Sequence, residues 1–550
     1  MPLGEVQSGM RCTGYSVVRG TDVATFDVQV IDVVDDKISG SGPRILVKAT
    51  GPAVDETGIG PGFSGSPIYC DSGTGVQRVI GAISESIGEF GGKVVLATPI
   101  EQIVGTPVDA PHAGTSASTA SLKGRRILAK AKPLNAPLTI GGLSPRLGAA
   151  LQKAAAKRGR VVLAAPAGPL GSFPVQTLKP GSAFGVGYSD GDIPASAIGT
   201  VSYVDGDKIW GFGHPLDGVG ARALMLQDAY VFRVINNPIA IGDSIGSYKY
   251  AAPGHTIGTL TSDGLNAVAG RVGAPPPSVP VLVVAKDRDT GAVQGVQTNV
   301  ADESAVDEPT GGTLLSLLAP LAVNQAGGAV LGGSPARLTG DACFTITLRE
   351  VSKPVHFCNR YVSDVADPLS GNTIAGAASS DLFSALSLVD FFRDAPVHVT
   401  NVEGSIEISR GQDQAFLRKV KLPKKAQSGA KVRATLVLRH VRGKRETRNV
   451  TLQLPRDLRP GKRTIVFNGP DTEFSSSDLF DFFDIDLGSD DSSGPTTVKG
   501  LAKAMNATGR YDGVTAKRAG RRKTVQSYRA SDIRITGRVK STIRIVKTPH

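Results

Sequence analysis

Residues 58–70 read GIGPGFSGSPIYC, and this stretch decides how the N-terminal part of the chain is interpreted. It places Ser64 between glycines and then runs through Pro67 into an apolar strand. Glycine lets a backbone turn its N–H groups toward a point where a Cβ would clash, so a serine on such a turn can serve as a nucleophile. The alternative is a loop that only joins two strands. Ser66 is the lesser candidate nucleophile, and we expect it to support the turn.

The sequence around this stretch has the two-residue period of β-strands. Runs such as TFDVQVIDVV and KVVLATPI, separated by turn residues, fill residues 1–105 and predict an all-β block. The composition agrees, because 67 Gly and 35 Pro with only 5% aromatic residues favour short strands and turns over long helices. The strand pattern returns at 176–310. We therefore expect a mainly β protein.

Changes in composition divide the chain into segments, and most have a recognisable pattern. The apolar run TLLSLLAPLAV at 313–323 is too short to span a bilayer and predicts a buried helix. The expected segments are a first β block with the serine motif (1–105), a linker (106–124), a small α/β segment (125–175), a second β block (176–310), a mixed helix and hairpin segment (311–395), a β-sandwich (396–470), and an acidic linker with a basic tail (471–550).

Four cysteines bear on the redox environment of the chain: Cys12, Cys70, Cys343 and Cys358. None forms a CxxC pair, so we expect no zinc site, and no motif calls for a cofactor. Cys343 and Cys358 lie in two strand-like runs that could pair, which allows a cross-strand disulfide, and the same logic applies to Cys12 and Cys70. The alternative is that all four are free buried thiols.

The net charge of +12 is concentrated around 418–463 and 517–547. In the first of these regions, basic residues alternate with apolar ones, which is typical of a solvated sheet face and also suits an anionic partner. The aromatic residues that stack on bases are missing from the basic face, so we expect no nucleic acid. A solvated face is the first interpretation, and an anionic cell-envelope polymer is the candidate if this face binds a partner.

The first residues, MPLGEVQSGMRC, contain neither a basic region nor an apolar one, so no export signal is visible in this sequence. No run of 18 apolar residues exists either, which predicts that the chain has no transmembrane segment.

A nucleophilic serine needs a base within hydrogen-bond distance and N–H donors for the oxyanion that forms. Of the seven histidines, His214 is the best candidate, because WGFGHPLDG gives it a Gly/Pro frame and an acidic neighbour, Asp217. We expect His214 to be the general base. The N–H groups of Gly62 and Ser64 are the expected oxyanion hole.

The order of the serine motif, hairpin and apolar strand resembles the second barrel of chymotrypsin-like and HtrA-like serine peptidases. More specifically, residues from about 3 to 300 resemble the SpoIVB peptidase family. The opening LGEVQSGMRCTGYSVVRGTDVATFDVQVIDVV, the serine block RILVKATGPAVDETGIGPGFSGSPIY and the histidine block IGTVSYVDGDKIWGFGHPLDG are all similar to blocks of that family.

The resemblance implies a chymotrypsin-like double β-barrel with a small α/β insert. It implies a serine endopeptidase that acts on a protein or peptide outside the cytoplasm, with Ser64 as nucleophile and His214 as base. The serine precedes the histidine here, which the family's namesake reverses, so we expect a circularly permuted arrangement. Asp263 is the expected third member of the triad. Asp217, Asp55 and a dyad without a carboxylate stay open.

Two other functions fit the same residues. One is a catalytically inactive peptidase fold that serves as a binding or cell-envelope module, in which case the serine does not react with electrophiles. The other is an esterase, since an acyl-transfer site does not reveal its leaving group.

Overall fold

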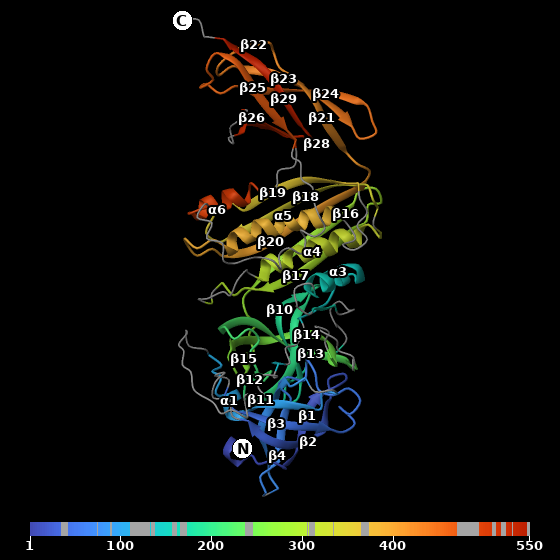
Figure 1. Cartoon of the computed structure of the whole chain (residues 1–550), viewed down its shortest axis with the longest axis vertical. Helices are drawn as coiled ribbons and strands as arrows, with labels where there is room; N and C mark the ends of the chain where they lie inside the picture. Colours follow the sequence, from blue (N-terminus) through green and yellow to red (C-terminus); the bar gives the residue numbers. More distant parts are fainter. Residues whose placement is uncertain are drawn as a thin grey trace. The chain divides into compact units, whose positions relative to one another are not determined.

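Figure 1 shows the computed structural model of the chain, which forms two compact units: residues 1–281 with 297–318, and residues 282–296 with 319–550. As the sequence predicts, the described residues are mainly in β-strands. The structure describes residues 1–34, 42–73, 75–88, 91–109, 132–133, 138–156, 162–164, 173–236, 246–304, 306, 314–333, 335–364, 373–469, 494–508, 513–518, 524–530 and 532–546.

The first unit begins with a closed six-stranded barrel (blue in Figure 1). Its strands pair in the order β1-β2-β3-β6-β5-β4, and β4 returns to β1, so every neighbouring pair is antiparallel and no edge is left unpaired. The strands are β1 (Arg11–Val17), β2 (Val23–Val34), β3 (Arg44–Thr50), β4 (Pro67–Asp71), β5 (Gln77–Ser86) and β6 (Val94–Pro99).

The alternation in β2 shows how one strand of the barrel faces both the core and the solvent. Phe26, Val28 and Val30 point into the core, while the residues between them are exposed. The disulfide Cys12–Cys70 joins β1 to β4 at the seam where the barrel closes, so one of the two expected pairings is present.

A second closed six-stranded barrel follows in the same unit (teal to green in Figure 1). Its pairing order is β10-β11-β12-β15-β14-β13, with β13 returning to β10, which repeats the connectivity of the first barrel. The strands are β10 (Ala183–Gly191), β11 (Ala195–Asp205), β12 (Lys208–Gly211), β13 (Gly220–Ile235), β14 (Tyr248–Asp263) and β15 (Val268–Val272).

Shorter elements surround the two barrels. The expected small α/β segment contains β8 (Leu138–Ile140), α3 (Pro145–Ala156) and β9 (Val162–Ala164), and β8 pairs with β11. The remaining elements are α1 (Ile100–Val104) after β6, β7 (Lys132–Pro133) on β5, and β17 (Val293–Ala301) on β10.

The second unit contains a layer in which β18 (Leu338–Leu348) pairs with β19 (Val355–Ser363) and with β20 (Val399–Arg410). Helix α5 (Thr373–Asp390) packs against β18 and β19. Residues 314–323 of the apolar run lie in α4 (Leu314–Val330), whose side chains are mostly buried, as predicted. The second disulfide, Cys343–Cys358, joins β18 to β19.

Two further sheets of this unit share one apolar core and form a β-sandwich. Strand β20 pairs with β18, so it lies outside the sandwich that the sequence predicts at 396–470, and strands from the basic tail complete both sheets instead. The strand orders are β24-β23-β21-β28 in one sheet and β22-β29-β25-β26-β27 in the other. The strands are β21 (Gln414–Lys421), β22 (Lys425–Gln427), β23 (Lys431–His440), β24 (Arg445–Gln453), β25 (Gly461–Asn468), β26 (Val514–Arg518), β27 (Thr524–Tyr528), β28 (Arg534–Thr536) and β29 (Arg538–Val546). The basic tail also contains α6 (Val498–Met505), and strand β16 spans Ser278–Asp287.

Most of the expected linker at 106–124 and the acidic stretch before 494 lie outside the described residues. Across the described ranges, no helix has the length and apolar character needed to cross a membrane.

Candidate active site

Ser64 lies in the loop between β3 and β4 of the first barrel, and it is fully buried. Gly62 and Gly65 on either side have φ of 93° and 90°, a backbone region that favours glycine. A Cβ on Gly65 would lie 1.9 Å from the carbonyl oxygen of Thr200, so the loop can approach β11 only because this residue has no side chain.

The backbone N–H groups of this loop divide into used and unused donors. Phe63 donates to Gly60, Gly65 donates to Ile83, and Ser66 donates to Phe63. The N–H groups of Gly62 and Ser64 donate to nothing that the structure describes, and the Oγ of Ser64 is likewise buried without a hydrogen bond. Buried N–H groups without a partner are rare in proteins. The two donors expected for the oxyanion hole are therefore the two donors left unused.

His214 lies on the turn after β12 of the second barrel, and it is 2% exposed. Phe212, two residues earlier, has a φ of 66°, which is strained for a bulky side chain, and such strain persists where the surrounding structure enforces it. The Nδ1 of His214 lies 2.6 Å from the carbonyl oxygen of Pro215. Because a carbonyl only accepts, Nδ1 carries the proton and Nε2 carries the lone pair.

Each of the two loops is held by the other barrel. Thr200 of the second barrel donates its N–H to Ser64 O at 2.8 Å and its hydroxyl to Gly62 O at 2.9 Å. In return, Thr98 of the first barrel donates its hydroxyl to Gly213 O at 2.6 Å, directly before His214.

The two loops also share a neighbour. The carbonyl of Ile83 accepts the N–H of Gly65 at 2.7 Å, and it lies 3.2 Å from the position that a Cβ on Gly213 would take. The residues next to Ser64 and next to His214 thus lie against one backbone group, although they are far apart in the sequence. Within the described part of the chain, Ser64 Oγ itself makes no hydrogen bond to His214.

The three carboxylates considered for a triad differ in their hydrogen-bond partners, although Arg222 lies near both Asp217 and Asp263. Asp263 is fully buried and accepts the N–H groups of Leu216, Asp217 and Gly218, each at 2.8 Å, so it fixes the segment that follows His214. Burial raises the pKa of the Asp263 carboxyl, against the opposing effect of these three N–H groups. Asp217 pairs with Arg222 at 3.0 Å, and Asp55 pairs with Lys93 at 3.1 Å. Of the three, Asp263 is the one that organises the His214 turn.

The structure also shows a buried polar cluster that the sequence did not reveal. Lys249 of β14 donates its Nζ to Ser16 Oγ at 2.7 Å and to Thr200 Oγ1 at 3.0 Å, and Nζ lies 4.6 Å from the centre of the Phe63 ring. The hydroxyls of Ser16 and Ser66 are 2.8 Å apart. Ser66 therefore helps to hold the turn, which is the supporting position expected for it.

Lys249 also contacts the serine loop with its backbone and its stem. Its N–H donates to Pro61 O at 3.0 Å, and its Cβ lies 2.8 Å from where a Cβ on Gly62 would be. The serine loop thus packs directly against both the backbone and the side chain of Lys249. A two-residue strand period cannot show that a lysine points inward, so the only signal in the sequence is the position of Lys249 within a tyrosine-flanked strand, which is weak.

No carboxylate of the described ranges forms an ion pair with Lys249, and the groups facing it from β1, β11 and the loop are hydroxyls and one aromatic ring. Burial lowers the pKa of Lys249 from 10.5 to about 7. Between these values the unfolded chain binds a proton here that the folded chain has lost, so stability rises with pH across this window.

We therefore expect the free energy of unfolding of the wild type to rise relative to that of Lys249→Met between pH 7 and 9.5, with a slope approaching about 1.4 kcal/mol per pH unit. Trp210, the single tryptophan, lies in β12 and reports unfolding of this unit by its fluorescence. Parallel pH profiles for the two proteins would show that Lys249 does not titrate in this range.

No family model, no curated protein and no solved structure matches this chain. The assignment of a function therefore depends on the geometry of the site.

Proposed function

We propose that the chain is a serine endopeptidase in which Ser64 is the nucleophile and His214 is the general base. The observation that carries this proposal is the set of unused groups on Gly62 and Ser64. Two N–H donors and one hydroxyl are buried there without hydrogen bonds within the described part of the chain. Such unsatisfied groups are costly, and they are what a tetrahedral oxyanion and its nucleophile need.

The chemistry follows from these groups. Ser64 Oγ forms a bond to the carbonyl carbon of the substrate as its proton passes to Nε2 of His214. The carbonyl oxygen becomes an oxyanion and accepts the N–H groups of Gly62 and Ser64. His214 then returns the proton to the leaving amine as the C–N bond breaks, and water releases the acyl group by the same steps. The Pro215 carbonyl keeps Nδ1 protonated and so takes the orienting role that a carboxylate has in a triad.

The double barrel supports a chymotrypsin-like arrangement with a permuted order. Both barrels have the same connectivity. The serine loop joins the third and fourth strands of the first barrel, and His214 follows the third strand of the second barrel. Asp263 lies on the second barrel as well, ahead of its last strand, and we propose that it acts on His214 through the backbone of 216–218.

A second candidate function, the binding module without catalysis, is favoured by the burial of the site. Ser64 and His214 are 0% and 2% exposed, so a substrate reaches them only after the site opens. The two functions differ in one observable. A fluorophosphonate probe forms a phosphonyl ester at Ser64 of a peptidase or an esterase, detected by peptide mass spectrometry, whereas a folded binding module stays unlabelled; hydrolysis of peptide and ester substrates then separates the first two.

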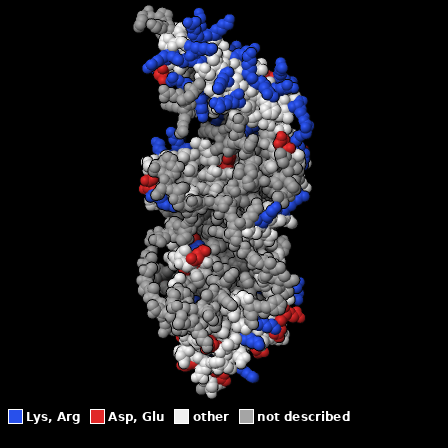
Figure 2. All heavy atoms as spheres, viewed as in Figure 1, with Lys and Arg blue, Asp and Glu red and all other residues white. Residues whose placement is uncertain are grey.

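The basic surface supports an anionic partner and a location outside the cytoplasm. Figure 2 shows Lys and Arg gathered on the part of the chain that carries the β-sandwich. Lys425, Arg544 and Lys462 are exposed and lie side by side on β22, β29 and β25. Like charges in neighbouring strands repel, and a polyanion would relieve that repulsion. Two disulfides also suit an oxidising compartment.

Replacing Lys425, Lys462 and Arg544 together with Ser should weaken binding of long-chain polyphosphate about tenfold and reduce its salt dependence, because three phosphate contacts are lost. The control replaces the exposed Lys48, Lys153 and Lys179 with Ser, which changes the net charge equally. Equal weakening by both triple variants would mean that net charge, and not this row, attracts the polymer.

A further inference from the structure

The disulfide Cys343–Cys358 lies on the solvent side of its sheet, in contrast to Cys12–Cys70. Cys358 is exposed and Cys343 is half-buried, whereas Cys12 and Cys70 are 7% and 1% exposed. The neighbours of Cys343 on its face of β18, Asp341 and Thr345, are half-buried, while Ala342 and Phe344 on the opposite face are fully buried. A dissolved thiol can therefore reach one of the two disulfides without unfolding the chain.

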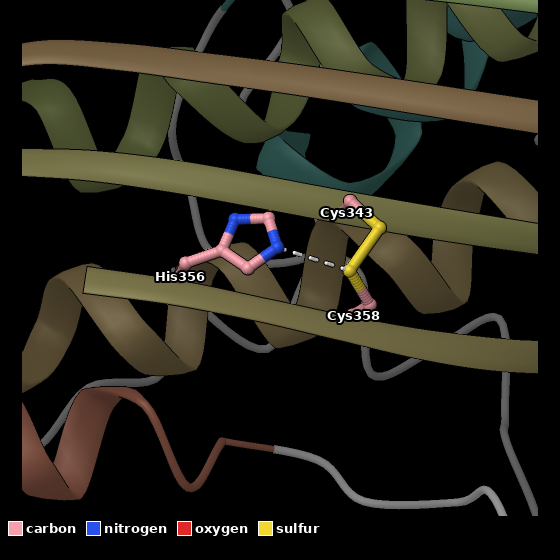
Figure 3. A group of neighbouring side chains, drawn as sticks. All are labelled: Cys343, His356 and Cys358. Atoms are coloured by element: carbon pink, nitrogen blue, oxygen red, sulfur yellow. Dashed lines mark hydrogen bonds between the residues drawn. A yellow bond between two sulfur atoms is a disulfide. The ribbon is translucent and has the colours of Figure 1, made fainter. Parts of the chain in front are cut away.

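A histidine is placed against one sulfur of this disulfide. His356 and Cys358 are two residues apart on β19 and share a face, and Nε2 of His356 lies 3.4 Å from Sγ of Cys358 (Figure 3). On the other side of the ring, Nδ1 lies 3.1 Å from Oγ1 of Thr345. When the hydroxyl donates to Nδ1, the ring proton is on Nε2 and points at the sulfur of Cys358.

The path of attack on the other sulfur is also open. Cys343 lies between Cys358 on β19 and Ser405 on β20, in one row across the sheet. Thiol–disulfide exchange proceeds by attack of a thiolate on one sulfur with departure of the other. A thiolate that attacks Cys343 from the side away from Cys358 passes over Ser405, whose side chain is small and exposed.

We infer that Cys343–Cys358 is a thiol-exchange site for a dithiol, with Cys343 attacked, Cys358 as leaving group and His356 as the donor that stabilises the departing thiolate. The thiolate of the dithiol forms a disulfide with Cys343, and the Cys343–Cys358 bond breaks to leave a Cys358 thiolate that accepts the Nε2–H hydrogen bond. The second thiol of the reagent then attacks its own sulfur in the mixed disulfide. The reagent leaves as a cyclic disulfide, and Cys343 and Cys358 have gained two electrons and two protons.

This site is independent of the proposed peptidase activity, because it lies in the other unit and uses none of the residues of the Ser64 site. It also gives a chemical role to His356, which lies on β19.

The test uses dithiothreitol on the native chain, followed by iodoacetamide and peptide mass spectrometry. We expect alkylation of Cys343 and Cys358 while Cys12 and Cys70 stay paired. With a monothiol and rapid quenching, the adduct should be found on Cys343. Equal reduction of the two disulfides in folded protein, or an adduct mainly on Cys358, would overturn the inference.

Variants of His356 test its part in the exchange. His356→Ala should slow the reduction of Cys343–Cys358 about tenfold, because the departing thiolate loses a charge-assisted hydrogen bond. His356→Gln keeps an N–H donor and should recover part of the rate. The matched control is His398→Ala, which removes a histidine of the same unit that contacts Glu350 instead. An unchanged rate of reduction of Cys343–Cys358 in His356→Ala, with thermal unfolding like that of wild type, would show that His356 takes no part in the exchange.

Discussion

Replacing Ser64 with Ala, or His214 with Ala, is expected to abolish labelling of the protein by a fluorophosphonate. Loss of the nucleophile removes the atom that forms the bond, and loss of the base leaves a hydroxyl that is a weak nucleophile. In serine hydrolases either change lowers turnover by about 10⁴-fold or more, and the two are not additive because the residues act as a unit. The rate constant of labelling, followed by mass spectrometry, should therefore fall to background in each single variant and no further in the double variant.

The matched control for this experiment is Ser202→Ala. Ser202 lies on β11, is buried, and its Oγ is also without a hydrogen bond in the described part of the chain, but it lacks the glycine frame and the unused N–H donors. Labelling should persist in this variant. Labelling of Ser64→Ala at the wild-type rate would reject Ser64 as the nucleophile. A folded wild type that is not labelled at all would favour the binding module.

Replacing Gly65 with Ala is expected to lower the free energy of unfolding by about 4 kcal/mol and to abolish labelling of Ser64. Two effects add. The φ of 90° is strained for alanine, and the new Cβ would lie 1.9 Å from Thr200 O and 2.6 Å from Phe212 N. Both neighbours are backbone atoms, so the loop must move away from β11. The hydrogen bond from Thr200 N–H to Ser64 O would then be broken, and the oxyanion donors would be displaced.

Gly206→Ala isolates the first of these two effects. Gly206 lies in the turn between β11 and β12 with a φ of 61°, and nothing lies within 4 Å of its added Cβ. Its cost should be only about 1 kcal/mol, with normal labelling of Ser64. Both variants are compared with wild type by chemical denaturation followed at Trp210. Equal effects of the two substitutions would mean that the close approach of the loop to β11 contributes little.

Several structural features followed from local patterns in the sequence. Period-two alternation predicted the strands, and the apolar run at 313–323 predicted α4, because burial of one face or of all faces produces a recognisable pattern of apolar residues. The cross-strand disulfides were one of two expectations, and the register that places Cys12 opposite Cys70 decided for them. The unused donors of Gly62 and Ser64 fit the expectation from the glycine frame, and the catalytic roles stay predictions.

Other features could not be predicted, since they depend on pairings between distant segments. The strands β28 and β29 come from the basic tail, yet they complete the two sheets of the sandwich, and β20 pairs with β18 instead of joining them. Alternative pairings between strands would bury similar apolar faces, so the alternation of apolar residues alone does not determine which strands pair.

Local patterns in the sequence suffice to predict that the chain is mainly β and that Ser64 and His214 each lie on a glycine-framed turn, because strand period and glycine conformations are local properties. The groups that those turns contact depend on tertiary pairing. The carbonyl of Ile83 lies next to both turns, and Thr200 and Thr98 each donate to the loop of the other barrel. Asp263 accepts from the backbone after His214, and Lys249 is buried against the serine loop. The physical reason is that closing a barrel brings strands from distant parts of the sequence within hydrogen-bond distance, and hydrogen-bond satisfaction is settled only in that closed state.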